Sequence, residues 1–144
     1  MSREILFRAK HIHAMDSNEH LNGTWVHGYL SDKNYIYDKS LDGEFLVDEN
    51  TICQYTGLTD KNGKKIFEGD IVRYGEICGE VKFGLHESNW QICKYNQGFY
   101  IEFPEESLYR KELGYWENKV VVIGNIYDSP KLLEDKENKY GENI

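Results

Sequence analysis

Residues 51–74, TICQYTGLTDKNGKKIFEGDIVRY, decide the fold class of this chain. Short apolar stretches alternate there with turns that contain glycine. The Asn62-Gly63 pair is a strong hairpin signal, because both residue types tolerate positive φ. A second turn at Glu68-Gly69-Asp70 leads into the apolar residues that follow. The segment therefore predicts short antiparallel strands joined by tight turns.

The same alternation of short apolar stretches and turns continues in both directions along the chain. Alternating apolar residues predict further strands at 5–9, 25–30, 35–37, 44–47, 80–83, 90–95, 99–103 and 119–123. The last of these is apolar enough to predict a central strand, and Asn96-Gln97-Gly98 predicts a turn. Pro104 predicts the start of a short helix over 105–113. We expect a mainly β fold (β-rich α+β) with short antiparallel strands, an SH3-like barrel in residues 51–127 and one or two short helices.

Composition agrees with a β-rich domain. The 144 residues include 11 tyrosines and 13 glycines but only two alanines, and alanine is the best helix former. This length suits one domain, which we place at 1–133, with an N-terminal β segment at 1–50 and a barrel-like part at 51–133. The polar residues 134–144 predict a flexible acidic tail.

The charge balance narrows the classes of partner. A net charge of −8 argues against general nucleic-acid binding, because affinity for phosphate needs a surplus of lysine and arginine on some face. No apolar run reaches the ~20 residues of a membrane span, and no signal peptide is recognisable at the start. We therefore expect no membrane partner and a cytoplasmic location.

The sequence predicts no metal, no cofactor and no catalytic residue. Cys53, Cys78 and Cys93 are too widely spaced to form a metal-binding pair and are expected to be free thiols. His11, His13, Asp16 and His20 lie close in sequence, but no rigid element is expected to fix them as ligands. Glu102, Glu105 and Glu106 are candidates for a pair of catalytic carboxylates, but two of them lie beside the proline turn and fit a helix-start charge pattern.

Two stretches resemble the YopX family of phage and prophage proteins. The first is QYTGLTDKNGKKIFEGDIV at 54–72, and the second is VIGNIYDSPKLL at 122–133. Phe7-Arg8-Ala9 is similar to the family's opening, although Lys10-His11 departs from it. The resemblance covers nearly the whole chain and implies a small, mostly β, phage-associated protein of the bacterial host cytoplasm. It implies no activity.

The residues that carry the resemblance have structural explanations. Glycines supply backbone freedom in turns, and aspartates bond nearby amides. We expect structural roles for Tyr55, Gly57, Asp60, Gly63, Gly69, Asp70, Gly124, Asn125 and Pro130.

Aromatic residues exceed what one small core needs, and they suit protein interfaces. The interface residues we predict are Trp25, Tyr29, Trp90, Tyr95, Tyr115 and Trp116. We expect a non-enzymatic accessory protein that contacts phage or host proteins and forms a homo-oligomer. One alternative is a nucleic-acid-associated module with an SH3-like barrel, using Lys61, Lys64, Lys65, Arg73 and Lys82. The other is an acidic inhibitor that mimics nucleic acid.

Overall fold

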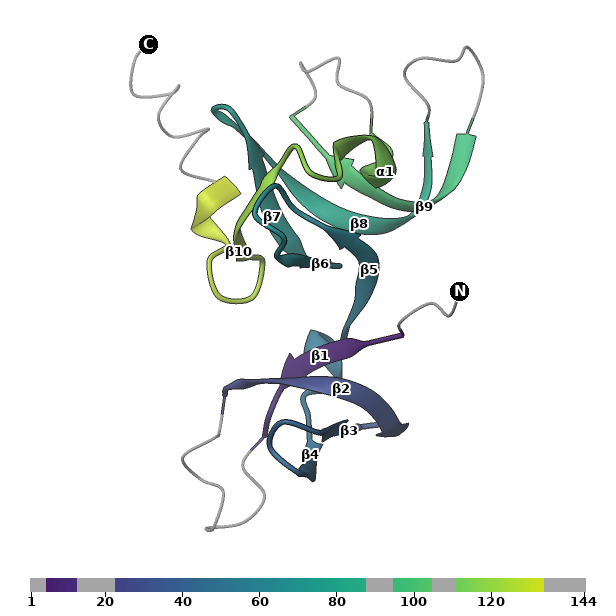
Figure 1. Ribbon diagram of the computed structural model, residues 1–144, viewed down its shortest axis with the longest axis vertical. Helices are drawn as coiled ribbons and strands as arrows, with labels where there is room; N and C mark the ends of the chain where they lie inside the picture. Colours follow the sequence, from purple (N-terminus) through teal and green to yellow (C-terminus); the bar gives the residue numbers. More distant parts are fainter. Residues whose placement is uncertain (1–4, 13–22, 88–94, 105–110, 134–144) are drawn as a thin grey trace. The chain divides into compact units, whose positions relative to one another are not determined.

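The chain forms two compact units, Met1–Gly57 (unit 1) and Leu58–Ile144 (unit 2). The computed structural model describes residues 5–12, 23–87, 95–104 and 111–133, with only the backbone of residues 87, 95 and 96. Figure 1 shows the elements of each unit along the chain. The division of residues 1–133 at residue 50 stays a prediction. The units of the structure meet within strand β5.

Unit 1 is an antiparallel sheet in which four strands follow one another as neighbours. The strand order is β4-β3-β2-β1-β5, and β5 continues into unit 2. The elements are β1 (Phe7–Lys10), β2 (Trp25–Asp32), β3 (Tyr35–Asp38), β4 (Gly43–Leu46), the 3-10 helix η2 (Glu49–Thr51) and β5 (Cys53–Thr59).

Backbone hydrogen bonds close this sheet on itself. The end of β1 pairs with the residues after β4 through an antiparallel bridge between His11 and Val47. The amide of Ile12 donates to the Leu46 carbonyl at 2.9 Å, and the amide of Asp48 donates to the Lys10 carbonyl at 2.9 Å. The ring encloses a core of five buried residues, Ala9, Val26, Ile36, Phe45 and Val47. Period-two alternation therefore places a small apolar interior inside strands of only four to eight residues.

Unit 2 is built on a second antiparallel sheet. Its strand order is β10-β7-β8-β9, while β6 pairs with the end of β5. The elements are β6 (Lys65–Phe67), β7 (Asp70–Tyr74), β8 (Ile77–Glu87), β9 (Tyr95–Glu102), α1 (Leu113–Trp116) and β10 (Val121–Asn125). A helical turn at 131–133 ends the described part.

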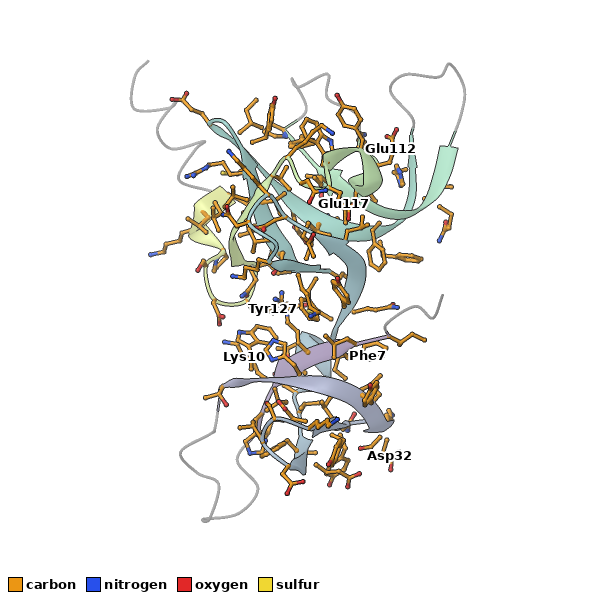
Figure 2. All side chains as sticks on the ribbon, in the orientation of Figure 1. Phe7, Lys10, Asp32, Glu112, Glu117 and Tyr127 are labelled. Carbon is orange, nitrogen blue, oxygen red and sulfur yellow. The ribbon has the colours of Figure 1, made fainter. Side chains whose placement is uncertain are left out.

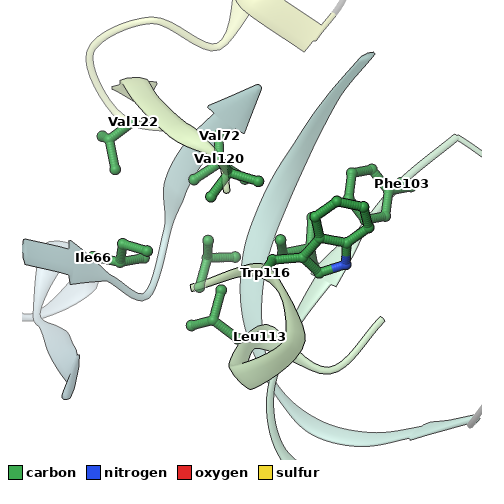
Figure 3. Packing of buried hydrophobic residues seen from close by; sticks show 9 residues of the cluster. Ile66, Val72, Phe103, Leu113, Trp116, Val120 and Val122 are labelled. Atoms are coloured by element: carbon green, nitrogen blue, oxygen red, sulfur yellow. The ribbon is translucent and has the colours of Figure 1, made fainter. Parts of the chain in front are cut away.

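The core of unit 2 gathers residues from every part of its chain. The buried cluster contains Ile66, Val72, Val81, Ile101, Phe103, Leu113, Trp116, Val120 and Val122. Figure 3 shows the Trp116 ring beside Phe103, and the two ring centroids lie 5.3 Å apart. Trp116 also contacts Tyr74, at 4.9 Å between centroids. One tryptophan therefore fastens α1 to the strands.

The predicted mainly β class is confirmed, as are the short helices. The predicted SH3-like barrel in residues 51–127 is wrong, because the described strands of this region do not close into a barrel. The four-stranded sheet ends at β10 and β9. The predicted helix over 105–113 lies mostly outside the described residues, and α1 begins at its last position.

Three local predictions about strands are corrected. Asn96-Gln97-Gly98 is not a turn but part of β9, where long-range pairing with His86, Leu85 and Gly84 outweighs turn propensity. The apolar strand at 119–123 is not central. Its counterpart β10 is an edge strand, because it stands last in the order of the four-stranded sheet, and the Asp60 turn bonds it through Val122.

The strand predicted at 80–83 also begins earlier and ends later than expected, because β8 runs from Ile77 to Glu87. Gly79 lies within β8, where an added β-carbon would come within 2.5 Å of the Ile101 side chain. Glycine is thus required there by close packing and not by a turn.

Candidate functional site

Asp60 organises the longest motif of the sequence. Its side chain is buried, with 1% of its surface exposed. One carboxylate oxygen accepts hydrogen bonds from the amides of Asn62 at 2.8 Å and Lys64 at 2.9 Å. The other accepts from the amide of Val122 at 2.9 Å, 62 residues further along the chain. A single carboxylate therefore shapes its own turn and binds the edge of β10.

The charge of Asp60 is stabilised where it is buried. Burial alone would raise the pKa of this carboxyl. The amide hydrogen bonds from Val122, Lys64 and Asn62 outweigh burial, and together with the Lys64 charge they hold the pKa below its ordinary value. The carboxylate is thus ionised at neutral pH and its lone pairs serve backbone amides.

The turn around Asp60 takes the form expected of Asn-Gly, but only one residue uses positive φ. Gly63 has φ of 82°. The Gly63 amide donates to the Asp60 carbonyl at 3.0 Å, and the Asp60 amide donates to the Lys64 carbonyl at 2.8 Å. Gly57, at the end of unit 1, also has positive φ, at 88°.

The second turn of the motif brings the two halves of the sequence resemblance together. Gly69 has φ of 87°, and the buried Asp70 accepts the Phe67 amide at 2.8 Å. The Ile126 amide donates to the Gly69 carbonyl at 2.9 Å. In the register of β7 with β10, Asp70 faces Asn125.

Asn125 ends β10 with a turn of its own. Its side-chain oxygen accepts the amides of Tyr127 and Asp128, each at 2.9 Å. Gly124 leaves room for the next turn of chain, because an added β-carbon would come within 2.8 Å of Leu132. Pro130 is exposed, and its carbonyl accepts the Leu133 amide at 3.2 Å. These residues shape the end of the fold.

Residues 6–134 match the sequence profile of the YopX protein family. The chain belongs to the YopX family. No curated protein matches it. Membership supports a phage-type protein, and the family description specifies no function. The YopX motif forms turns and sheet edges, and the exposed aromatic and apolar surfaces lie outside it.

Among the described residues of this YopX protein, the most exposed aromatic side chain is Tyr29 on unit 1. Tyr29 faces Tyr37 across the β2–β3 pair, and Tyr35 lies two residues before Tyr37 on the same side of β3. Their exposed fractions are 60% for Tyr29, 40% for Tyr35 and 37% for Tyr37. We name these three residues the tyrosine face. The intervening Ile36 points the other way, into the core.

Cations accompany an aromatic ring further along the same sheet. The Arg8 guanidinium carbon lies 4.8 Å from the centroid of the Trp25 ring, and the Lys10 ammonium nitrogen lies 5.6 Å from it. Lys10 pairs directly with Trp25 in the β1–β2 register. Figure 2 shows the side chains of unit 1, with Lys10 and Phe7 marking β1 and Asp32 the end of β2. Trp25 is half-buried, so Tyr29 is the more accessible of the two predicted interface residues in this unit.

The other predicted interface residues have different positions. Trp116 is 3% exposed and belongs to the core of unit 2, so it offers no surface. Tyr115 is 39% exposed and lies 4.6 Å from the Lys119 ammonium. Trp90 and the Tyr95 side chain lie outside the described residues. Sequence spacing could not separate these cases, because burial of an aromatic side chain depends on contacts far along the chain.

Unit 2 exposes an apolar surface that the sequence reasoning missed. Phe83 and Leu85 on β8 are 52% and 66% exposed. Phe83 faces Phe99 across the β8–β9 pair, with ring centroids 4.9 Å apart, and Leu85 faces Gln97. We name these four residues the hairpin face. The strict alternation of residues 81, 83 and 85 was the signal that could have found it.

The opposite side of the same hairpin carries the charges. Lys82 and Glu102 form an ion pair, which raises the pKa of Lys82. Burial raises the pKa of Glu80, and the carboxylates of Glu102 and Glu68 add to this effect against the charge of Lys82. His86 stacks on Tyr100, at 4.6 Å between centroids. This arrangement stabilises the strand pair. It also pairs Lys82, a candidate nucleic-acid contact, with Glu102, a candidate catalytic carboxylate.

The basic residues of the nucleic-acid alternative fall into two groups. Lys82 is bound to Glu102. Lys61, Lys64, Lys65 and Arg73 are exposed, spread over the Asp60 turn, β6 and β7.

Within the described residues, no group of three or more histidine, cysteine, aspartate or glutamate side chains is arranged to hold a metal ion. His11 is buried, and its Nδ1 lies 2.8 Å from the Leu46 carbonyl. His13, Asp16, His20, Cys93, Glu105 and Glu106 lie outside the described residues. Cys53 is buried and Cys78 is half-buried, and both are thiols that form no disulfide.

The buried Tyr55 completes the motif, its amide donating to the Leu6 carbonyl at 2.8 Å within unit 1. None of the helices in the described part of the chain has the length and apolar character to cross a membrane.

Proposed function

We propose that this YopX-family chain is a non-catalytic phage accessory protein that binds another phage or host protein through the tyrosine face of unit 1. The observation that carries the proposal is the position of Tyr29, Tyr35 and Tyr37 on one side of β2 and β3, exposed while their neighbours fill the core. We place its action in the bacterial cytoplasm because of the family's phage association.

Tyrosine suits protein recognition for a physical reason. Its ring supplies apolar contact area at little entropic cost, and its hydroxyl bonds the polar rim. The tyrosine face contributes nothing to the buried cluster of unit 1, which contains Ile36 and Phe45 on the other side. A large aromatic area that folding does not use is the pattern of a binding surface.

The non-catalytic part of the proposal is supported by how the buried carboxylates are used. Asp60 and Asp70 accept backbone amides of turns. Asp38 accepts the His27 amide at 2.9 Å and the Ser40 hydroxyl at 2.6 Å. Carboxylates held in this way are structural acceptors rather than general acids or bases.

The test is site-specific photo-crosslinking in bacteria that carry the phage. A benzophenone amino acid replaces Tyr37, and the control replaces Tyr74 of unit 2, which is similarly exposed at 42% against 37%. We expect a discrete protein adduct from position 37 and none from position 74.

The added substitution Tyr29→Ser should lower the yield of this adduct about tenfold, because an anchoring tyrosine is typically worth ~1–2 kcal/mol or more. Equal adducts from both positions, no adduct, or an adduct unaffected by Tyr29→Ser would overturn the proposal.

A second candidate function has its own observation. The stacking of Arg8 and Lys10 on Trp25 combines cations with an aromatic ring, as single-stranded nucleic-acid sites do. Fluorescence anisotropy with a single-stranded oligonucleotide tests it. Submicromolar binding that weakens steeply with salt and with Lys10→Glu, but not with Lys64→Glu, would promote this candidate over protein binding.

We also propose that the chain associates with copies of itself. The support is that unit 2 exposes large apolar side chains away from its core cluster.

A further inference from the structure

We infer that the hairpin face of unit 2 (Phe83, Leu85, Gln97 and Phe99) is a docking surface for the same face of a second copy of the chain. This inference rests on the self-association proposed above and names its surface.

The hairpin face is continuous with the buried core of unit 2. Along one side of the β8–β9 pair, Val81 and Ile101 are completely buried. The next cross-strand pair, Phe83 with Phe99, lies at the margin, where Phe99 packs against the core cluster. Leu85 then reaches 66% exposure. The apolar side of the hairpin therefore extends beyond the core of unit 2, and its outermost residues are left exposed to solvent.

The distribution of charged residues on the hairpin also favours a contact through this face. The chain carries a net charge of −8, so two copies repel each other wherever carboxylates meet. Three cross-strand pairs on this side contain no charged residue, namely Val81 with Ile101, Phe83 with Phe99 and Leu85 with Gln97. The other side of the same strands carries Glu80, Lys82 and Glu102. Of the two sides of the described hairpin, the hairpin face is therefore the one on which a like-with-like contact avoids carboxylate repulsion.

The surface area that this contact can bury is small, and it determines the expected affinity of the dimer. A large apolar side chain buries up to ~150–250 Å². Three partly exposed apolar residues on each of two copies give roughly 600–900 Å² in total, below the range of standard stable interfaces. The dimer is therefore weak, with a dissociation constant on the order of 100 µM. It forms fully only where local concentration is high.

Sedimentation equilibrium of the full chain, from about 5 to about 500 µM, tests the inference. The expected mass rises with concentration from the 16.9 kDa of one chain towards twice that value. Leu85→Glu should abolish the rise, because it places a carboxylate on the contact at a position too exposed to disturb folding. The matched control is Leu41→Glu in unit 1, which adds the same charge at a leucine that is 44% exposed.

Salt provides a second measurement. An apolar contact between acidic chains should persist or strengthen at high salt, because repulsion is screened. A mass constant at one chain would overturn self-association itself. A rising mass that Leu85→Glu leaves unchanged, that Leu41→Glu abolishes equally, or that high salt removes would overturn the hairpin face while self-association stands.

Discussion

Unit 1 and unit 2 reach a stable β core by different means. Unit 1 closes four strands into a ring through backbone hydrogen bonds around five buried apolar side chains, of which Phe45 is the largest. Unit 2 gathers nine buried residues, including Trp116, and ties its turns with buried aspartates. The residues that carry the YopX resemblance lie mostly in unit 2, whereas the tyrosine face lies in unit 1. The comparison indicates that a conspicuous sequence motif can mark the architecture of one unit while the surface proposed for recognition lies on the other.

The sharpest way to break unit 1 is Gly28→Ala. An added β-carbon would lie 1.8 Å from the Tyr37 carbonyl oxygen, so β2 and β3 must separate. We expect a loss of more than about 3 kcal/mol in the free energy of unfolding of unit 1. Amide hydrogen exchange at Ile36 measures it.

Gly43→Ala is the matched control, because its nearest atom would be a Phe45 ring carbon at 3.7 Å. It should change stability by less than about 1 kcal/mol. If Gly28→Ala leaves exchange at Ile36 unchanged, the tight ring described for unit 1 is incorrect.

Asp60→Ala tests the corresponding feature of unit 2. It leaves the amides of Asn62, Lys64 and Val122 without their acceptor, and we expect a loss of about 3 kcal/mol. Exchange at the Val122 amide should accelerate most, while Ile36 in unit 1 keeps its protection. Glu44→Ala, which removes an exposed carboxylate from a strand, is the control. Equal acceleration of amide exchange in both units would mean that the two cores do not unfold independently.

Acid sharpens the comparison with a smaller effect. Burial would raise the pKa of Asp38, but hydrogen bonds from Ser40, His27 and Leu41 hold it below its ordinary value of 3.8, and the pKa of Asp60 is lowered likewise. A lowered native pKa stabilises the fold above the unfolded value, and that stability disappears as pH falls through the native value. Both units should therefore weaken below about pH 4.

Urea unfolding from pH 7 to about pH 2 measures this loss. Asp38→Asn should flatten the pH dependence of unit 1 alone, and Asp60→Asn that of unit 2 alone. A single variant that flattens both would contradict the assignment of one carboxylate to each unit.

The sequence predicted what local chemistry determines. The turns at Asn62-Gly63 and Glu68-Gly69-Asp70 follow from glycine and aspartate, and both are present. It failed where distant residues decide. Asn96-Gln97-Gly98 has turn chemistry, yet pairing with β8 keeps it in a strand.

The surfaces show the same limit. The partner of Asp60 is an amide 62 residues away, which no local pattern reveals. Tyr29 and Tyr37 meet only because of the β2–β3 register, which shifts between Leu30 and Asp32. Trp116 and Tyr115 are adjacent in sequence, yet one is core and the other surface.

The closure of unit 1 also sets an order of events during synthesis. The ring is complete once Asp48 can bond Lys10, so unit 1 has all of its closing partners early in translation. The Asp60 tie cannot form until Val122 has left the ribosome. Closing a longer loop costs more entropy and slows folding. We therefore expect the nascent chain to form the tyrosine face before β7 can pair with β10, the strand that contains Val122.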